Sequence, residues 1–283
     1  MKTINSLSGG KSSSYLAANY KVDYNVFALV RTEDVNCKFP DELIRKQVED
    51  RIQKPFVGTL EDDTIIYTML DLEQFIGSKI DWVSGITFDE VVRSKGGWLP
   101  NKLHRYCTSH MKIEPIFYWW AENIGEVIIE NIGFRSGEES RAKRMKKKLI
   151  GGKLVFKATF EKHKNGKNKW EDVSWAIPKF PLIEDNIFKD FVNAYWKDKP
   201  VRFASKNNCV GCFHQNPILL NYRFNNDKES NKKKLAWFEN QELGRKKGTW
   251  RSDASYSKIR RKQFTMDLFD DMFDDCDSGG CGL

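Results

Sequence analysis

The sequence predicts an α/β fold built around a mostly parallel sheet, and three observations support this prediction. Segments of strand type and helix type alternate through the first 52 residues, which is typical of a parallel α/β sheet. Residues 25–30 (Asn-Val-Phe-Ala-Leu-Val) form an apolar run of strand length, as expected for a strand that helices cover on both faces. Residues 153–160 and 170–177 flank Asn165-Gly166, a strong hairpin signal, so we expect a β-hairpin insert.

The first part of the chain supplies its strands and helices in turn. Residues 4–7 are expected to form the first strand and residues 12–19 the first helix, before the apolar strand. Pro40 opens the next helix, which runs to about Ile52, because proline suits the first turn of a helix. Residues 64–76 are ambiguous, since their first residues favour a strand while the later apolar residues have helical spacing.

The remaining elements lead to a separate C-terminal part. Thr87 and Glu90 have the spacing of a capping box, so a helix is expected to begin there and to end near Gly96. Further elements are expected at 79–83 (strand), 111–121 (buried helix), 126–134 (strand), 140–148 (basic helix) and 185–196 (helix). We expect three parts: an α/β domain over 1–205 with the insert at about 151–178, a helical region over 206–265, and an acidic, flexible tail over 266–283.

Length and composition predict a soluble, cytoplasmic protein. The chain has 283 residues, of which 40% are hydrophobic and 30% charged, which suits one large domain with a smaller appendage. No run is long enough to span a membrane, and Ser8 and Gly9 interrupt the N-terminus before a signal peptide could form. Because disulfides are rare in the cytoplasm, the six cysteines are expected to be thiols or metal ligands.

The net charge of +8 is unevenly distributed along the chain. Basic stretches occupy 141–148, 232–234, 245–247 and 258–262, whereas the tail is acidic. A basic face favours a polyanionic partner, either a nucleotide or a nucleic acid. The alternative is that these stretches are ordinary solvated faces of helices.

A glycine loop, residues 8–13 (Ser-Gly-Gly-Lys-Ser-Ser), separates the first strand from the first helix. The backbone N–H groups of such a turn point outward at the positive end of the helix dipole, so the turn can bind an anion. The two glycines let a phosphate approach closely. A Walker A loop would require glycine where the chain has Asn5, so this type of phosphate loop is excluded. A plain helix cap is the alternative.

Two further polar stretches are expected near this loop. Residues 105–108 (Arg-Tyr-Cys-Thr) and Lys112 precede the buried helix, while Arg135 directly follows a strand and Arg141 lies on the next helix. Thr32 follows the second strand. Because ligands bind beyond the carboxyl ends of parallel strands, we expect the loop, Thr32 and Arg135 at one edge of the sheet.

Together these motifs resemble the phosphoadenosine phosphosulfate (PAPS) reductase family of the PP-loop ATP pyrophosphatase (adenine nucleotide α-hydrolase-like) superfamily, including its relatives common in phages and the PP-loop enzymes of DNA phosphorothioation. The resemblance covers about residues 4–215 and departs at Ser12, where members usually carry Asp. The matching stretches are the PP-loop at 8–13, the Arg-x-Cys…Lys-x-x-Pro element from Arg105 to Pro115, the Gly-x-Arg…Glu-Ser-Arg element from Gly133 to Arg141, and Phe180-Pro181-Leu182.

The resemblance implies a Rossmann-like α/β/α sandwich that binds ATP or PAPS. It implies cleavage of ATP at the α-phosphate, with adenylation and pyrophosphate release, in sulfur transfer or nucleic-acid modification. Mg²⁺ is an implied cofactor, and nucleic acid, a sulfur donor or thioredoxin are implied partners. The implied catalytic residues are Lys11, Ser13, Arg135 and Arg141. The implied nucleotide-binding residues are Ser8, Gly9, Gly10, Lys11, Ser12, Ser13, Thr32, Arg105, Lys112, Arg135 and Arg141.

The cysteines suggest a metal site. Cys209 and Cys212 form a CxxC motif, whose spacing lets both sulfurs reach one metal ion. Relatives in the family hold an iron–sulfur cluster with such a motif and a cysteine of the Arg-x-Cys element, here Cys107. No further cysteine follows closely, so an iron–sulfur cluster and Zn²⁺ both stay open, as do unligated core thiols. The candidates for a fourth ligand are His214, His110, Cys37 and a cysteine of the tail.

Two other functions stay open. Reductases of the family carry a nucleophilic cysteine in a C-terminal Glu-Cys-Gly-Leu-His, of which Cys281-Gly282-Leu283 matches three letters. The chain would then be a sulfonucleotide reductase in which Cys281 attacks the sulfur of PAPS. Ser12 in place of Asp instead favours a non-catalytic protein that binds a nucleotide or a nucleic acid and keeps a structural metal.

Overall fold

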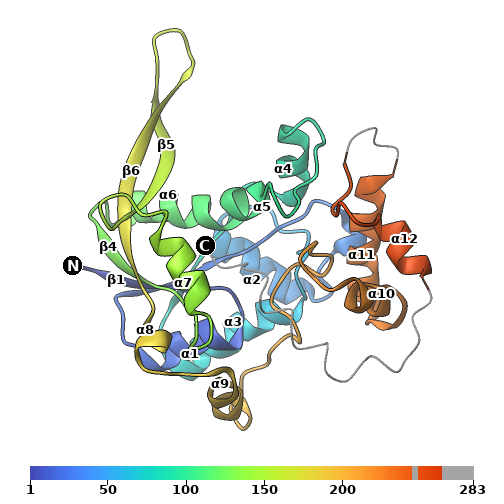
Figure 1. Ribbon diagram of the computed structural model, residues 1–283, viewed down its shortest axis with the longest axis horizontal. Coiled ribbons are helices and arrows are strands. Elements are labelled where there is room, and N and C mark those ends of the chain that lie inside the picture. Colours follow the sequence, from blue (N-terminus) through green and yellow to red (C-terminus); the bar gives the residue numbers. More distant parts are fainter. Residues whose placement is uncertain (244–247, 263–283) are drawn as a thin grey trace.

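The computed structural model describes residues 1–243 and 248–262, and its centre is a six-stranded sheet (Figure 1). The strand order is β3-β2-β1-β4-β6-β5, and all neighbours are parallel except β5 and β6. This confirms the predicted α/β fold with a mostly parallel sheet and is consistent with a Rossmann-like fold. The strands are β1 (Thr3–Leu7), β2 (Tyr24–Ala28), β3 (Ile80–Val83), β4 (Ile128–Asn131), β5 (Leu154–Lys162) and β6 (Asn168–Lys179).

Helices pack on both faces of the sheet because the strands alternate their apolar side chains. In β2, Phe27 points into one hydrophobic cluster and Val26 into the other. The first cluster is completed by α1 (Lys11–Asn19), α2 (Glu42–Ile52), α3 (Thr64–Ile76) and α9 (Lys189–Trp196), and the second by α6 (Glu114–Asn123). The other helices are α4 (Phe88–Ser94), α5 (Tyr106–Thr108), α7 (Glu139–Lys146), α8 (Pro181–Glu184), α10 (Pro217–Asn226), α11 (Glu229–Glu242) and α12 (Tyr256–Arg261), with short turns of other helix types at Val35–Cys37 and Ser109–Ile113.

Local capping decides several boundaries that the sequence left open or placed wrongly. The carboxylate of Asp41 accepts the backbone N–H of Ile44 at 3.0 Å, so Asp41 is the cap of α2 and Pro40 lies outside the helix rather than in its first turn. The predicted capping box of Thr87 and Glu90 is confirmed. The ambiguous segment 64–76 is a helix, α3, because its apolar residues are buried along one face against the sheet.

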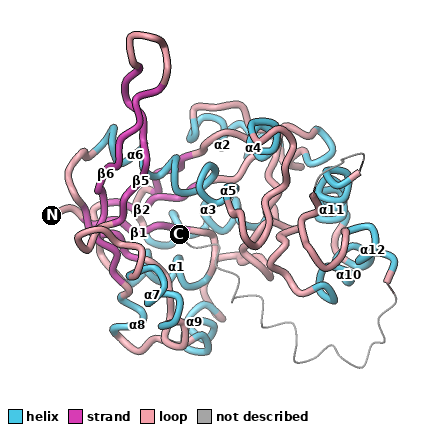
Figure 2. Tube along the Cα trace, turned by 45° about the horizontal axis from the view of Figure 1, so that its top comes forward, coloured by secondary structure: helices cyan, strands magenta, loops and turns pink. Residues whose placement is uncertain are grey.

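The C-terminal helices pack together beside the sheet (Figures 1 and 2). Helices α10, α11 and α12 surround an aromatic cluster in which Trp237, Phe238, Trp250 and Tyr256 are buried. On α11, Asn231 and Lys234 are three residues apart and therefore lie on one helical face, which binds the buried segment that precedes α3. Among the described helices, none combines the length and the apolar content needed to cross a bilayer.

Strands β5 and β6 form a long hairpin that leaves the body of the protein (Figure 1). Its base belongs to the sheet, since β6 pairs with β4 from Ile128↔Ala176 onward and Trp175 is buried. From Phe160 to Asp172 every residue is exposed. We call residues 160–172 the arm.

Candidate functional site

A pocket of about 630 Å³ opens where the strand order reverses direction. From β1 the chain adds β2 and β3 on one side, and it then returns to place β4 on the other side of β1. The ends of β1 and β4 therefore diverge into a crevice, which is where open α/β sheets bind ligands. Ser8 follows β1 and Gly133 follows β4, and both line the pocket, whose volume suits a small molecule.

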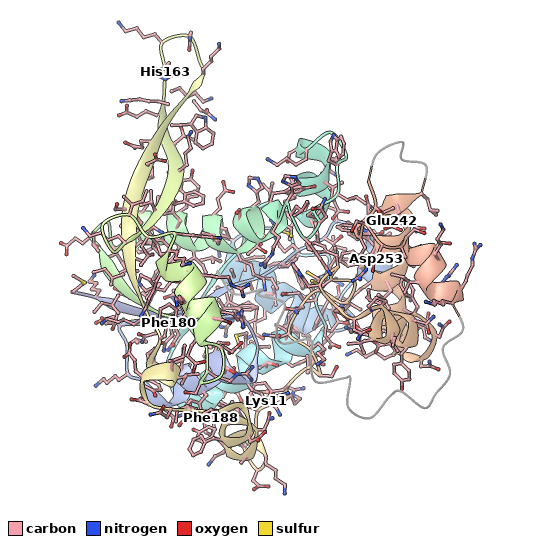
Figure 3. All side chains as sticks on the ribbon, viewed as in Figure 1. Lys11, His163, Phe180, Phe188, Glu242 and Asp253 are labelled. Carbon is pink, nitrogen blue, oxygen red and sulfur yellow. The ribbon has the colours of Figure 1, made fainter. Side chains whose placement is uncertain are left out.

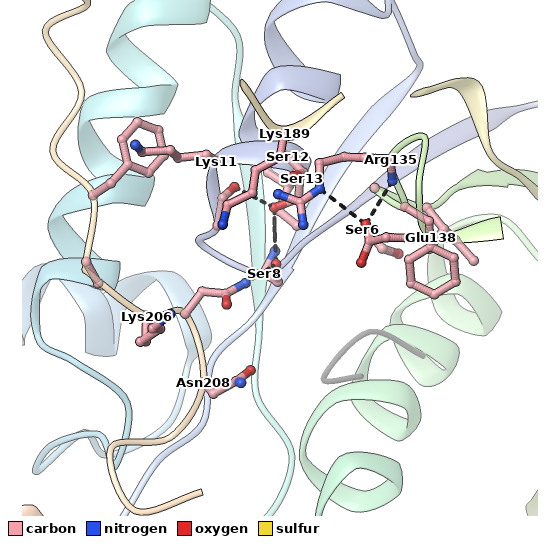
Figure 4. Close-up of a pocket in the computed structure, with 18 of the residues that line it drawn as sticks. Ser6, Ser8, Lys11, Ser12, Ser13, Arg135, Glu138, Lys189, Lys206 and Asn208 are labelled. Atoms are coloured by element: carbon pink, nitrogen blue, oxygen red, sulfur yellow. Dashed lines mark hydrogen bonds and ion pairs between the residues drawn. The ribbon is translucent and has the colours of Figure 1, made fainter. Parts of the chain in front are cut away.

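The glycine loop forms one wall of this pocket, between Arg135 on one side and Lys206 on the other (Figure 4). Gly9 has φ +75°, and a Cβ there would lie 2.5 Å from Ile65, so only glycine fits this turn. The hydroxyl of Ser13 accepts the N–H of Ser8 at 3.2 Å and donates to the carbonyl of Gly10 at 3.0 Å. The loop is thus closed on itself by Ser13.

Helix α1 begins in the pocket wall without a side-chain cap. Its N-cap residue is Gly10, which has no side chain to cap the first turn. This turn, Lys11 to Ser13, lines the pocket. The N–H groups of a first helical turn have no acceptor inside the helix, and the helix dipole favours negative charge there. This wall is consequently suited to an oxyanion.

The charged residues that line the pocket also favour a negatively charged ligand. Among the described residues that line the pocket, Glu138 is the one acidic residue, against seven basic ones: Lys11, Lys112, Arg135, Arg141, Lys189, Lys197 and Lys206. The ammonium group of Lys11 donates to the amide oxygen of Asn193 on α9 at 3.0 Å, which fixes its position. A formal excess of six positive charges in one concave site strongly favours a polyanionic ligand.

Arg135 and Arg141 are held by a shared carboxylate. Glu138 accepts from Nε of Arg135 at 3.2 Å and from Nη1 of Arg141. The guanidinium of Arg141 also lies 4.2 Å from the centre of the Phe134 ring, a cation–π distance. Both guanidinium groups are thereby fixed at the pocket, and a guanidinium is well suited to the oxygens of a phosphate.

A buried carboxyl lies behind the pocket wall. Glu130 in β4 is fully buried, and one of its oxygens accepts the hydroxyl of Ser6, a pocket residue. Burial raises the pKa of Glu130 to about 7, although the Ser6 hydrogen bond acts in the opposite direction. This group titrates near neutral pH, directly behind a site that favours anions.

Most of the predicted nucleotide-binding residues meet at this pocket, and three lie elsewhere. Ser8, Gly10, Lys11, Ser12, Ser13, Lys112, Arg135 and Arg141 all line it. Gly9 packs behind the loop against α3. Thr32 is buried and its hydroxyl binds the carboxylate of Asp89 at 2.7 Å, so it does not line the pocket. Arg105 lines a second, smaller pocket.

The second pocket brings the predicted metal ligands together. It has a volume of about 30 Å³, and Cys107, Cys209, Cys212 and His214 all line it. Burial, aided by the charges of Arg105, Lys102 and Arg251, lowers the pKa of His214 to about 4, so the ring is neutral at pH 7. Its buried Nε2 has no hydrogen-bond partner among the described residues.

The donors of the second pocket fit a metal in their chemistry but are not arranged as a closed coordination site. Thiolates and a neutral imidazole are the usual ligands of Zn²⁺ and of iron–sulfur clusters. Within residues 1–243 and 248–262, however, no three His, Cys, Asp or Glu side chains are placed to hold one ion. Of the other candidate ligands, His110 binds Glu114 at 2.7 Å and Cys37 does not line this pocket. Cys281 and the acidic tail lie outside the described residues.

Lys112 links the two pockets and reveals a residue that sequence analysis missed. Lys112 lines both pockets, and its ammonium group donates to Glu61 at 2.8 Å. Glu61 is 1% exposed, lines the cysteine pocket, and carries a second oxygen without a hydrogen-bond partner. No local motif marks Glu61. Glu130, by contrast, could have been noticed as an acidic residue within the apolar run of β4.

Comparisons of the chain with family models, with curated proteins and with solved structures find no match.

Proposed function

We propose that the chain is a PP-loop enzyme of PAPS reductase type that binds ATP, or a related adenine nucleotide, and cleaves it at the α-phosphate. The observation that carries this proposal is the position of the glycine loop. It lies at the switch point of the sheet, in a pocket of nucleotide size whose lining, in the part of the chain that the structure describes, has seven basic residues and one acidic residue. Apolar side chains of the same pocket, Trp196, Phe203 and Ile116, offer surfaces for an adenine ring.

In the proposed reaction an oxygen of the acceptor attacks the α-phosphorus and pyrophosphate leaves. The bond between the α-phosphorus and the bridging oxygen breaks, and pyrophosphate carries away that electron pair. The contribution of the chain is charge stabilisation, from the N–H groups of the α1 turn and from Lys11, Arg135 and Arg141. Because Glu138, Asn193 and the Phe134 ring hold these groups in place, little reorganisation accompanies the reaction.

Mg²⁺ is expected to arrive with the nucleotide rather than as a resident ion. Proteins bind Mg²⁺ through one or two carboxylates together with substrate phosphates. Within residues 1–243 and 248–262, the one carboxylate that lines the pocket is Glu138, which already neutralises two arginines, and the residue at the position of the family Asp is Ser12. These described residues therefore do not fit a protein-held Mg²⁺.

We expect the double variant Ser13→Ala, Arg135→Ala to lose pyrophosphate release by at least about a hundredfold, since a single oxyanion donor contributes about that much. The measurement is release of labelled pyrophosphate from ATP in the presence of a DNA duplex or a single-stranded RNA as acceptor, and with water alone. The matched control is Ser14→Ala, Arg93→Ala. Ser14 is buried beside the loop without lining the pocket, and Arg93 is exposed on α4. Equal loss in both variants would contradict the assignment.

A nucleotide-binding protein without turnover is the second candidate, favoured by the neutralised carboxylate. In this case ATP binds to the wild-type chain and binds more weakly to the double variant, while no acceptor yields pyrophosphate. Absence of ATP binding by the wild-type protein would reject both candidates.

We also propose that Cys107, Cys209, Cys212 and His214 hold a metal, either Zn²⁺ or an iron–sulfur cluster, next to the nucleotide site. Cys209→Ser is expected to lose the bound metal, as measured by elemental analysis and by the visible spectrum of anaerobically purified protein. Cys37→Ser is the control, because Cys37 does not line this pocket and burial raises the pKa of its thiol to about 12. Full occupancy in the Cys209 variant would disprove the ligand set.

A further inference from the structure

The arm projects away from the packed body, and its contact with the body lies at its base, where the centre of the Phe160 ring is 6.2 Å from that of Phe117 and 6.0 Å from that of Tyr118 on α6. Residues 160–172 are exposed without interruption, and the labelled His163 lies at the far end of the hairpin (Figure 3). With about 3.3 Å per residue along a strand, the arm reaches about 15–20 Å beyond the body. A two-stranded ribbon alone is marginally stable in water, so a protruding one of this length indicates a function outside the core.

The composition of the arm indicates what it contacts. Its tip, residues 162–169, reads Lys-His-Lys-Asn-Gly-Lys-Asn-Lys, with four lysines and no acidic or apolar residue. Directly below the tip, Trp170 is 55% exposed and Phe160 is 53% exposed. Lysines for a backbone of phosphates, combined with exposed aromatic rings on which bases stack, are the features of nucleic-acid binding surfaces.

The register of the hairpin places positive charge on both of its faces. Lys162 is opposite Asn168, whereas Lys169 is opposite Glu161, one position further along. Opposite residues share a face and successive residues alternate, so Lys162 lies on the face of Asn168, and Lys167, next to Asn168, lies on the other face. Lys169 forms an ion pair with Glu161 at 3.0 Å, so Lys167 rather than Lys169 supplies the positive charge of that second face. A ribbon that is basic on both faces suits insertion into a groove lined by phosphates better than flat contact with one acidic surface.

A second basic surface lies between the arm and the pocket. Helix α7 carries Arg141 at the pocket, and its end is joined to β5 through Gly151-Gly152. The exposed basic residues in and just after this helix are Lys143, Arg144, Lys146, Lys147 and Lys148. Helix α7 thus continues the positive charge from the pocket toward the base of the arm.

We propose that the arm binds nucleic acid and holds it as the acceptor of the reaction in the pocket. Naming the acceptor rests on the proposed function, whereas the binding itself does not require it. The candidate ligands share a phosphodiester backbone with bases that can stack, as in duplex DNA, single-stranded DNA and RNA. An acidic protein and an anionic membrane are different partners, which the test below distinguishes.

The test is fluorescence anisotropy with a labelled DNA duplex and with single-stranded DNA and RNA of the same sequence, titrated at several salt concentrations. We compare the wild-type chain with a tip variant and with a control variant that removes the same charge. The tip variant carries Lys162→Ser, Lys164→Ser, Lys167→Ser and Lys169→Ser. The control carries Lys21→Ser, Lys38→Ser, Lys46→Ser and Lys233→Ser, all exposed residues away from the arm.

The tip variant is expected to bind at least one of the three nucleic acids ten times more weakly or worse, with a shallower dependence on salt. The control variant should bind within about twofold of the wild type. If single strands are the ligand, Trp170→Ala should weaken binding by about five- to a hundredfold. Equal weakening of the tip and control variants would overturn the proposal, and so would wild-type binding to polyglutamate or to phosphatidylserine vesicles as tight as to nucleic acid.

The two proposals can fail separately. ATP binding should be unchanged in the tip variant, because the tip is not among the residues that line the pocket. Binding of nucleic acid that depends on the arm, together with no binding of ATP, would reject the proposed function but support the proposed role of the arm. Pyrophosphate release from ATP with water as the acceptor, together with no binding of nucleic acid, would reject the proposed role of the arm and support ATP cleavage at the α-phosphate.

Discussion

Replacement of Lys234 by methionine is expected to lower the free energy of unfolding by about 3–5 kcal/mol. Lys234 on α11 is 1% exposed, and its ammonium group donates to the carboxylate of Asp63 at 2.5 Å and to the carbonyl of Glu61 at 2.7 Å. Methionine fills a similar volume but leaves the buried carboxylate of Asp63 without its counter-charge. The cost of an uncompensated buried charge exceeds the gain from the added apolar side chain.

Urea unfolding monitored by tryptophan fluorescence measures this effect. Lys233→Met is the matched control, since Lys233 is the exposed neighbour on the same helix and its replacement should change stability by less than about 0.5 kcal/mol. The double variant Lys234→Met, Asp63→Asn should recover part of the loss, because it removes the unpaired charge. Similar unfolding midpoints for the Lys234 and Lys233 variants would show that the C-terminal helices do not depend on this ion pair.

The second large effect concerns the buried carboxyl of Glu130. Its pKa rises from an ordinary value of 4.5 to about 7 in the folded protein, because burial disfavours the charged form. Between these two values the folded protein binds the proton while the unfolded chain releases it, so stability falls as the pH rises through this window. The difference corresponds to about 3 kcal/mol, which is fully lost above about pH 7.

Glu130→Gln should remove this dependence, because the amide has a similar shape, still accepts from Ser6 and does not ionise. We expect the variant to show a flatter stability profile from pH 5 to 8 and to be more stable than the wild type at pH 8, measured by chemical unfolding at each pH. Glu171→Gln, an exposed acid on the arm, is the control and should follow the wild-type profile. Parallel profiles for the Glu130 variant and the wild type would contradict the raised pKa.

The sequence predicts the elements of the fold well where local chemistry decides them. The capping box of Thr87 and Glu90 fixes the start of α4, and the Asn165-Gly166 turn lies between two paired strands. Prediction fails where a nearby residue competes for the same role, as when Asp41 rather than Pro40 begins α2. Residues 64–76 could not be assigned from the sequence, because burial against the sheet, and not local propensity, makes them helical.

For a similar reason, the sequence predicted some residues of the candidate site and missed others. The loop, Arg135 and Arg141 follow strand ends, and the positions of strand ends can be inferred from hydrophobic patterning. Asn193, Lys206 and Asn207 come from segments whose return to the pocket depends on how α9 and the following chain pack. Thr32 follows a strand as predicted, yet Asp89 binds its hydroxyl away from the pocket.

By itself, the sequence determined the alternation of strands and helices, the glycine loop at the start of α1 and the excess of basic residues. These features depend on near neighbours along the chain, such as hydrophobic period, turn residues and caps. Only the tertiary structure decided that Glu138 joins Arg135 to Arg141, that Glu61 binds Lys112 between the two pockets, and that the hairpin projects into solvent. Such contacts depend on burial and on long-range packing, which a linear pattern does not encode.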